Sequence, residues 1–118
     1  MRAKDAVGRY GERVAAAYLE GRGWQVLDRN WRGPDGELDI VALRAGELIV
    51  VEVKTRRGLG FGHPAEAVTA RKRARLRRLT AQWLAAHEVR PRSLRIDVIA
   101  VLVPRSGAAR VEHLVGAV

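Results

Sequence analysis

Two runs of β-branched and aliphatic residues, joined by a short connection that contains a glycine, constrain this chain more than any other feature. Residues 36–42 (GELDIVA) and 48–55 (LIVVEVKT) each have the composition of a strand, and the short link between them predicts a β-hairpin. Both runs read as buried, yet they contain three charged side chains: Asp39, Glu52 and Lys54. A buried charge is costly unless it is paired or bound to a metal ion. The hairpin therefore needs compensating charge.

The register of the hairpin suggests how that charge is arranged. If the turn is centred between Ala45 and Gly46, Asp39 faces Glu52 and Glu37 faces Lys54, with opposed Cβ atoms roughly 4.5–5.5 Å apart. Two carboxylates at that distance repel unless a cation lies between them, and Mg²⁺ suits one or two carboxylates together with water and phosphate oxygens. We therefore predict a catalytic group of Asp39, Glu52 and Lys54, in which the lysine positions or deprotonates a water, or offsets charge on the phosphate.

The same residues resemble a known nuclease pattern. Asp39 followed by Glu52-Val53-Lys54 resembles the PD-(D/E)XK signature, and the flanking residues 36–42 and 51–56 resemble the bacterial YraN-like family over nearly the whole chain. The resemblance implies a restriction-endonuclease-like fold, similar to that of archaeal Holliday junction resolvases. It also implies Mg²⁺- or Mn²⁺-dependent cleavage of DNA, with the carbonyl of Val53 as a further metal ligand. Resolvase-like enzymes act as dimers, so the resemblance also implies that the protein can form a homodimer.

Glu12 is a further candidate metal ligand on the first predicted helix, residues 5–22. It lies at the edge of an apolar stripe, and the neighbouring Gly11 allows the helix to approach a sheet closely. The resemblance points the same way, because resolvase-like members carry a glutamate on this helix. The alternative is a surface glutamate paired with Arg9 or Arg13. The stripe consists of Val7, Tyr10, Val14, Ala17 and Tyr18.

A strongly basic helix is predicted after the hairpin. Thr69 is the expected N-cap of a helix that runs to about His87, with an apolar stripe of Leu76, Leu79, Trp83 and Leu84. The net charge of the chain is +9, which favours a polyanionic partner, most simply nucleic acid; the nuclease resemblance implies DNA. Solubility or a ribosomal neighbour are the alternatives. The candidate nucleic-acid-binding residues are Arg56, Arg57, Arg71, Lys72, Arg73, Arg75, Arg77 and Arg78.

The remaining pattern predicts one α/β domain over residues 1–118. Strands are expected at 24–31 and 94–103, and residues 111–115 can add an edge strand, so that the order helix, three strands, helix, strand gives a mixed central sheet flanked by helices. The absence of cysteine excludes disulfides and zinc–thiolate sites. With no apolar run of membrane-spanning length, a cytoplasmic protein without a membrane role is the expectation.

Several residues have competing interpretations. Asp35 lies in a Pro-Asp-Gly turn, which accounts for it without a catalytic role. Asp97, within an apolar strand, needs a partner, either an arginine or a metal ion. His63, in the glycine-rich loop after the hairpin, is either an acid–base group or a loop histidine with no role. Lys54 is one of only three lysines beside 19 arginines, which favours a specific need for an ammonium group.

Three alternatives to a nuclease remain at this point. The chain can be a catalytically inactive nucleic-acid-binding protein, or a partner subunit of a DNA repair or translation assembly. The third alternative is that Asp39, Glu52 and Lys54 form a buried salt-bridge cluster. A dependence of DNA binding on metal separates the first alternative from the nuclease.

Overall fold

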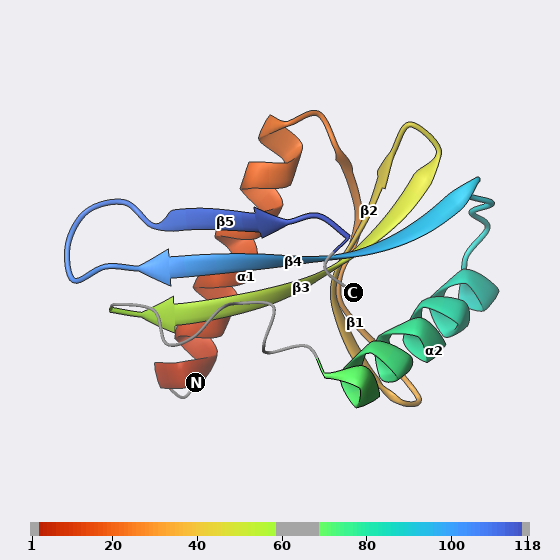
Figure 1. Cartoon of the computed structure of the whole chain (residues 1–118), viewed down its shortest axis with the longest axis horizontal. Helices are drawn as coiled ribbons and strands as arrows, with labels where there is room; N and C mark the ends of the chain where they lie inside the picture. Colours follow the sequence, from red (N-terminus) through yellow and green to blue (C-terminus); the bar gives the residue numbers. More distant parts are fainter. Residues whose placement is uncertain (1–2, 59–68, 117–118) are drawn as a thin grey trace.

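A five-stranded mixed sheet with one helix on each face forms the molecule (Figure 1). The computed structural model describes residues 3–58 and 69–116. The strands lie in the order β1-β2-β3-β4-β5, and only β3 and β4 pair in parallel. This confirms the predicted fold class and the edge strand. The elements are α1 (Ala3–Gly21), β1 (Gln25–Gly33), β2 (Gly36–Arg44), β3 (Glu47–Arg57), α2 (Ala70–Ala86), β4 (Ser93–Val103) and β5 (Arg110–Leu114).

The hairpin of β2 and β3 turns where the sequence predicts. Arg44 pairs with Glu47, and the two turn residues, Ala45 and Gly46, have positive φ angles of 49° and 82°. Positive φ at both central residues is the requirement of a type I′ hairpin turn. Arg92 braces this turn, because its backbone N–H donates to the carbonyl of Gly46 at 2.8 Å and its guanidinium donates to the carbonyl of Ala45.

Beyond Ile40 and Val51 the hairpin opens. That pair is the last in the β2–β3 ladder, while β2 continues to pair with β1 as far as Gly36 and β3 continues to pair with β4 as far as Arg57. The register is the predicted one, since Ile40 pairs with Val51, but the ladder ends there, so Asp39 with Glu52 and Glu37 with Lys54 are not ladder pairs. The two strands separate before these residues meet, because each follows its outer neighbour. We call this opening, at Asp39 on β2 and at Glu52 and Val53 on β3, the fork.

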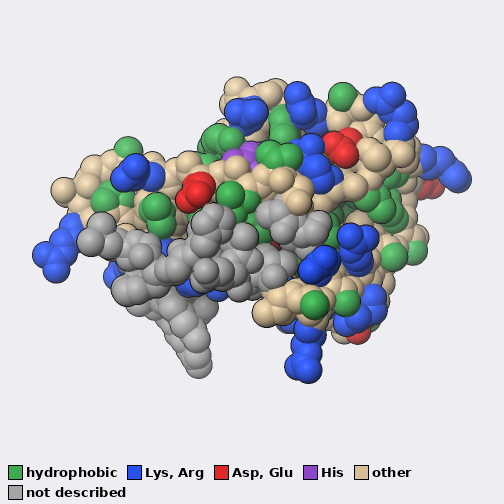
Figure 2. Space-filling view, in the orientation of Figure 1, with side chains coloured by type: hydrophobic (Ala, Val, Ile, Leu, Met, Phe, Trp, Pro, Cys, Tyr) green, Lys and Arg blue, Asp and Glu red, His purple; other side chains and the backbone are tan. Residues whose placement is uncertain are grey.

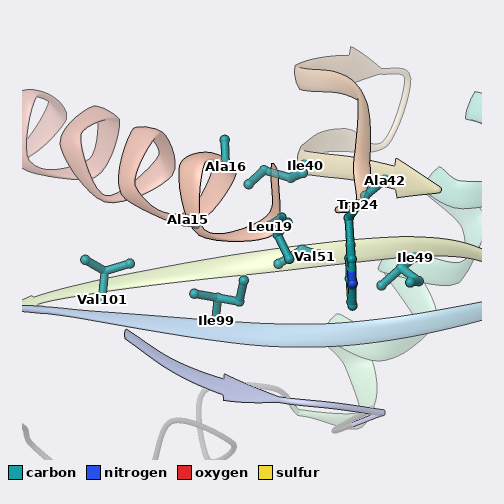
Figure 3. Close-up of a cluster of buried hydrophobic side chains, with 10 residues drawn as sticks. All are labelled: Ala15, Ala16, Leu19, Trp24, Ile40, Ala42, Ile49, Val51, Ile99 and Val101. Carbon is teal, nitrogen blue, oxygen red and sulfur yellow. The ribbon is translucent and has the colours of Figure 1, made fainter. Parts of the chain in front are cut away.

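Small side chains bring α1 close to the sheet (Figure 3). Ala15, Ala16 and Leu19 are buried against the strands, whereas Tyr10 is 38% exposed and Ala17 is exposed. The predicted stripe is thus rotated from the buried face. A side chain at Gly11 would collide with Thr55, so the helix can lie this close only where it carries small residues.

The opposite face is covered by α2. Its first turn is capped by Thr69, whose Oγ1 accepts a hydrogen bond from the backbone N–H of Lys72 at 3.2 Å. Leu76, Leu79 and Trp83 are fully buried, as the sequence predicts, in a second core cluster with residues of β2, β3 and β4. In the part of the chain that the structure describes, neither helix is long and apolar enough to cross a membrane.

Candidate metal and nucleic-acid site

The carboxylate of Asp39 occupies the fork. Its Oδ2 accepts a hydrogen bond of 2.8 Å from the backbone N–H of Val53. A side chain of β2 thus replaces the main-chain pairing that β3 loses at this point. Asp39 and the Glu52-Val53-Lys54 segment are brought together as expected, although by this bond and not by direct cross-strand opposition.

Three carboxylates converge at the fork. One oxygen each of Glu12, Glu37 and Asp39 lies within 4.8 Å of the others, and we call these three residues the acidic group. Opposite oxygens in an octahedral shell of Mg²⁺ lie about 4.2 Å apart, so the upper limit of 4.8 Å is of the same order as the width of such a shell. Glu12 is half-buried and contributes one of the three oxygens.

Glu37 is the member that sequence reasoning missed. Its carboxylate receives a hydrogen bond of 3.4 Å from Arg32 of the neighbouring strand, and it does not meet Lys54 in the ladder. The available signal was its position two residues before Asp39, which places both side chains on one face of a regular strand.

The electrostatics of the acidic group favour an added cation. Burial, with the adjacent charge of Glu52, raises the pKa of Asp39 to about 8 despite the hydrogen bond from Val53. Glu12 and Glu37 contribute in the same direction. Burial also raises the pKa of Glu12, although its hydrogen bond with Asn30 opposes the shift. A cluster of hard oxygen donors with surplus negative charge fits Mg²⁺ or Mn²⁺.

Glu52 is compensated from within the chain. Its Oε1 lies 2.6 Å from Nζ of Lys72 on α2, and their side chains are only 14% and 20% exposed. Two residues that the sequence assigns to different partners, a metal ion and a phosphate, are thus paired with each other. The next residue on that face of β3 is Lys54, whose pKa is lowered by burial and by the charges of Arg56 and Lys72, against the opposing effect of Glu52 and Asp39.

The other basic residues of α2 point outward. Figure 2 shows Lys and Arg side chains around the part of the surface that α2 forms. Arg78 lies 3.9 Å from Asp35, which also accepts a hydrogen bond of 2.7 Å from Gln82 and so has the structural role predicted for it. Arg57 is exposed and Arg56 half-buried at the end of β3. The exposed basic residues of α2 are Arg71, Arg73, Arg75, Arg77 and Arg78.

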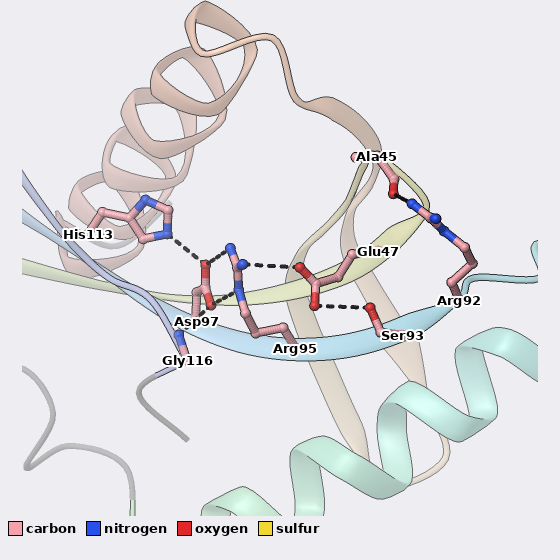
Figure 4. Close-up of polar contacts among 8 residues, drawn as sticks. All are labelled: Ala45, Glu47, Arg92, Ser93, Arg95, Asp97, His113 and Gly116. Carbon is pink, nitrogen blue, oxygen red and sulfur yellow. Dashed lines mark hydrogen bonds and ion pairs between the residues drawn. The ribbon is translucent and has the colours of Figure 1, made fainter.

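Asp97 is held by partners within the chain, which we call the Asp97 cluster (Figure 4). Arg95 donates to it from Nε at 2.8 Å and from Nη2 at 3.0 Å, Gly116 donates its backbone N–H at 2.8 Å, and Nε2 of His113 lies 2.7 Å away. Burial opposes ionisation, but these bonds hold the pKa of Asp97 below its usual value. The predicted arginine partner is confirmed. His63 lies outside the described residues.

Comparison with known proteins identifies relatives across most of the chain. The model of "Uncharacterised protein family UPF0102" matches residues 11–101. A UPF0102 protein of Beutenbergia cavernae is 65% identical over 116 residues, covering 98% of both chains. The UPF0102 protein of Kineococcus radiotolerans is 57% identical over 117 residues, covering 98% of this chain and 96% of its own. That of an Arthrobacter species is 54% identical over 116 residues, covering 98% of both chains.

Proposed function

Since the chain belongs to UPF0102, a family whose description states no activity, we propose from its chemistry that it is a nuclease that uses Mg²⁺ or Mn²⁺ to hydrolyse phosphodiester bonds of DNA at the fork. The observation that carries the proposal is the acidic group, Glu12, Glu37 and Asp39, whose oxygens lie within 4.8 Å of one another. Glu52 and Lys54 adjoin it on the next strand. A divalent ion relieves the repulsion among these carboxylates, and the basic surface of α2 suits a polyanion.

Each residue has a distinct role in this proposal. The acidic group, Glu52 and the Val53 carbonyl would hold the ion, which would supply polarisation of the phosphate and a lowered pKa of a nearby water. Lys54 positions that water. The lowered pKa of Lys54 also increases the fraction of neutral amine that can accept the water's proton.

The proposed reaction is a hydrolysis, in which the phosphodiester takes up one water molecule. The water oxygen forms a bond to phosphorus while the bond from phosphorus to the leaving sugar oxygen breaks. One proton leaves the attacking water, and the departing oxygen receives a proton from solvent. Branched DNA is the substrate to try first, because the resemblance to resolvases implies it, and a dimer is the assembly that the same resemblance implies.

The test is a panel of branched, nicked and linear DNAs incubated with purified protein and Mg²⁺ or Mn²⁺. We expect cleavage that EDTA abolishes, and a loss of roughly 10²–10³-fold in Asp39→Asn and Glu52→Gln, the usual size when a group that stabilises the transition state is removed. Asp35→Asn is the matched control and should cleave normally, since Asp35 serves the β1–β2 turn. Cleavage that survives in Asp39→Asn contradicts the site.

The same panel separates the nuclease from a protein that only binds nucleic acid. A binding protein should show no cleavage on any substrate, and its affinity for DNA should be the same with Mn²⁺ and with EDTA. The nuclease proposal expects both measurements to depend on the ion.

A further inference from the structure

Lys72 differs from every other basic residue of α2, because it points into the fold. The five arginines of this helix are exposed, whereas Lys72 is half-buried. The cap at Thr69 fixes the position of its backbone, since Oγ1 of Thr69 accepts from the N–H of Lys72. From there its side chain extends to Glu52 on β3, where Nζ and Oε1 are 2.6 Å apart.

This ion pair occupies a residue that the metal site needs. Glu52 is not among the three carboxylates that approach one another closely, and its charge is already neutralised by Lys72. Because both side chains are largely shielded from water, separating them without replacing the partner of each is unfavourable. A divalent ion can take Glu52 only if Lys72 leaves it, and the displaced ammonium then needs an anion of its own.

The choice of lysine at this position fits a residue that changes partner. The chain has 19 arginines and three lysines, yet both of the basic side chains that adjoin Glu52 at the fork are lysines, Lys54 and Lys72. Arginine holds a carboxylate with a rigid fork of donors, whereas the ammonium of lysine is a point charge on a flexible stem. An arginine would bind Glu52 more firmly and release it less readily.

We propose that Lys72 exchanges partners: it neutralises Glu52 while no divalent ion is bound there, and it contacts a phosphate of the nucleic acid once an ion has replaced it on Glu52. The inference rests on the proposed function and adds a regulatory link to it. Metal binding and DNA binding become coupled through one side chain, and linkage requires that each raises the affinity for the other by the same factor.

The first test measures Mn²⁺ binding to the protein alone by calorimetry, without DNA. Lys72→Met keeps the apolar stem and removes the competing charge, so Mn²⁺ should bind about five- to tenfold more tightly, the lower end of typical coupling between sites. Lys72→Arg should bind Mn²⁺ no more tightly than the wild type, because the guanidinium still pairs with Glu52. Arg73→Met, at an exposed neighbouring position, is the matched control and should leave Mn²⁺ affinity unchanged.

The second test measures the affinity for a short fluorescent DNA duplex with and without Ca²⁺, with product analysis to confirm that the DNA stays intact. In the wild type, Ca²⁺ should raise DNA affinity. Lys72→Met should bind DNA as the wild type does without Ca²⁺ and should show a smaller increase with Ca²⁺, because only the part due to the ion itself is left. Arg73→Met should weaken binding equally under both conditions and so keep the wild-type ratio, because its side chain has no part in the exchange.

Failure of this inference is distinguishable from failure of the proposed function. If the wild type binds no Mn²⁺, the metal site itself is wrong, and the partner exchange fails with it. If the wild type binds Mn²⁺ and cleaves DNA, but Lys72→Met has unchanged Mn²⁺ affinity or the wild-type Ca²⁺ ratio, only the exchange is overturned. Thermal unfolding of each variant confirms that it is folded.

Discussion

Asp39 and Asp97 are both aspartates within apolar strands of the same sheet, and their surroundings are opposite. Asp97 is fully buried and receives hydrogen bonds from Arg95, His113 and Gly116. Asp39 receives one, from Val53, and it lies among the carboxylates of Glu52, Glu12 and Glu37, with Lys54 as a nearby cation. The pKa of the first is lowered and that of the second is raised to about 8. Hydrogen bonds and an opposite charge favour the ionised form, whereas burial beside like charges disfavours it.

The difference separates a structural carboxylate from a candidate binding carboxylate. The chain provides every partner that Asp97 needs, so its charge stabilises the fold. At the fork, the chain places Glu12, Glu37 and Asp39 together, and Arg32 pairs with Glu37 alone. Such an arrangement is unfavourable in isolation and becomes favourable when a cation binds, which is why perturbed carboxylates mark candidate functional sites.

The largest expected effect on stability comes from removing Asp97, whose charge is compensated within the chain. Asp97→Ala removes the acceptor of the buried His113 side chain and one of the two carboxylate acceptors of the half-buried Arg95. We expect the free energy of unfolding to fall by about 3–5 kcal/mol, the usual cost of removing one partner of a buried pair. Urea denaturation followed by circular dichroism measures this. A loss below about 1 kcal/mol, the range of exposed pairs, would show that the Asp97 cluster does not stabilise the fold as we infer.

A smaller change in stability, of opposite sign, is expected when the charge of Asp39 is removed. Asp39→Asn retains an acceptor for Val53 and removes the charge, so at pH 9 without metal it should raise the free energy of unfolding by on the order of 1–3 kcal/mol. The same variant should lose metal binding. If Asp39→Asn destabilises the metal-free protein at this pH, the charge of Asp39 is compensated in a way that the structure does not show.

The pH dependence follows from the same two shifts. The folded-state pKa of Asp39 is raised from 3.8 to about 8, so its stabilising contribution is present below pH 3.8 and is lost as the pH rises through about 8. The pKa of Asp97 is lowered from 3.8, so its contribution is present above pH 3.8 and is lost as the pH falls further. Melting temperatures of the wild type and Asp39→Asn, with EDTA, should diverge steadily from acid to alkaline pH.

The smallest expected effect is the number of protons released when Mn²⁺ binds, which tests the ionisation state of Asp39. At pH 7 the carboxyl group of Asp39 is largely protonated, because its pKa is about 8, and a metal ion binds the ionised form. Mn²⁺ binding should therefore release about one proton per ion. Calorimetry in two buffers with different ionisation enthalpies measures this number. A value near zero would mean that Asp39 is already ionised or does not bind the ion.

Local patterns were sufficient for the hairpin turn, the N-cap of α2 and the buried strands. Gly46 in a short link located the hairpin turn, and Thr69 located the start of α2, because the requirement for a positive φ or a capping oxygen is set by adjacent residues. The need for a partner at Asp97 was also readable, since an acid in a continuous apolar run must be compensated.

The fork was not predictable in the same way. Counting residues from the turn predicts that β2 and β3 continue to pair beyond Ile40 and Val51. Instead, β2 continues along β1 and β3 along β4. These pairings depend on the whole sheet and not on the hairpin alone. The phase of α1 was also missed, because a pattern search favours large apolar residues such as Tyr10, whereas close packing at Gly11 and Thr55 favours small ones. Glu37 and Lys72 acquired their positions at the site from the way distant elements cross, which no local pattern encodes.

The Asp97 cluster also bears on the order in which the molecule assembles. The hydroxyl of Tyr18 lies 3.1 Å from Nδ1 of His113, a contact between residues 95 positions apart. The β2–β3 hairpin needs only its own turn, but this contact needs nearly the whole chain, and the entropic cost of closing a loop grows with its length. The cluster should therefore form late in folding, so that its loss speeds unfolding and leaves the folding rate almost unchanged. Asp97 therefore stabilises a fold whose β2–β3 hairpin has formed earlier. In stopped-flow experiments, Asp97→Ala should raise the unfolding rate and leave the folding rate almost unchanged.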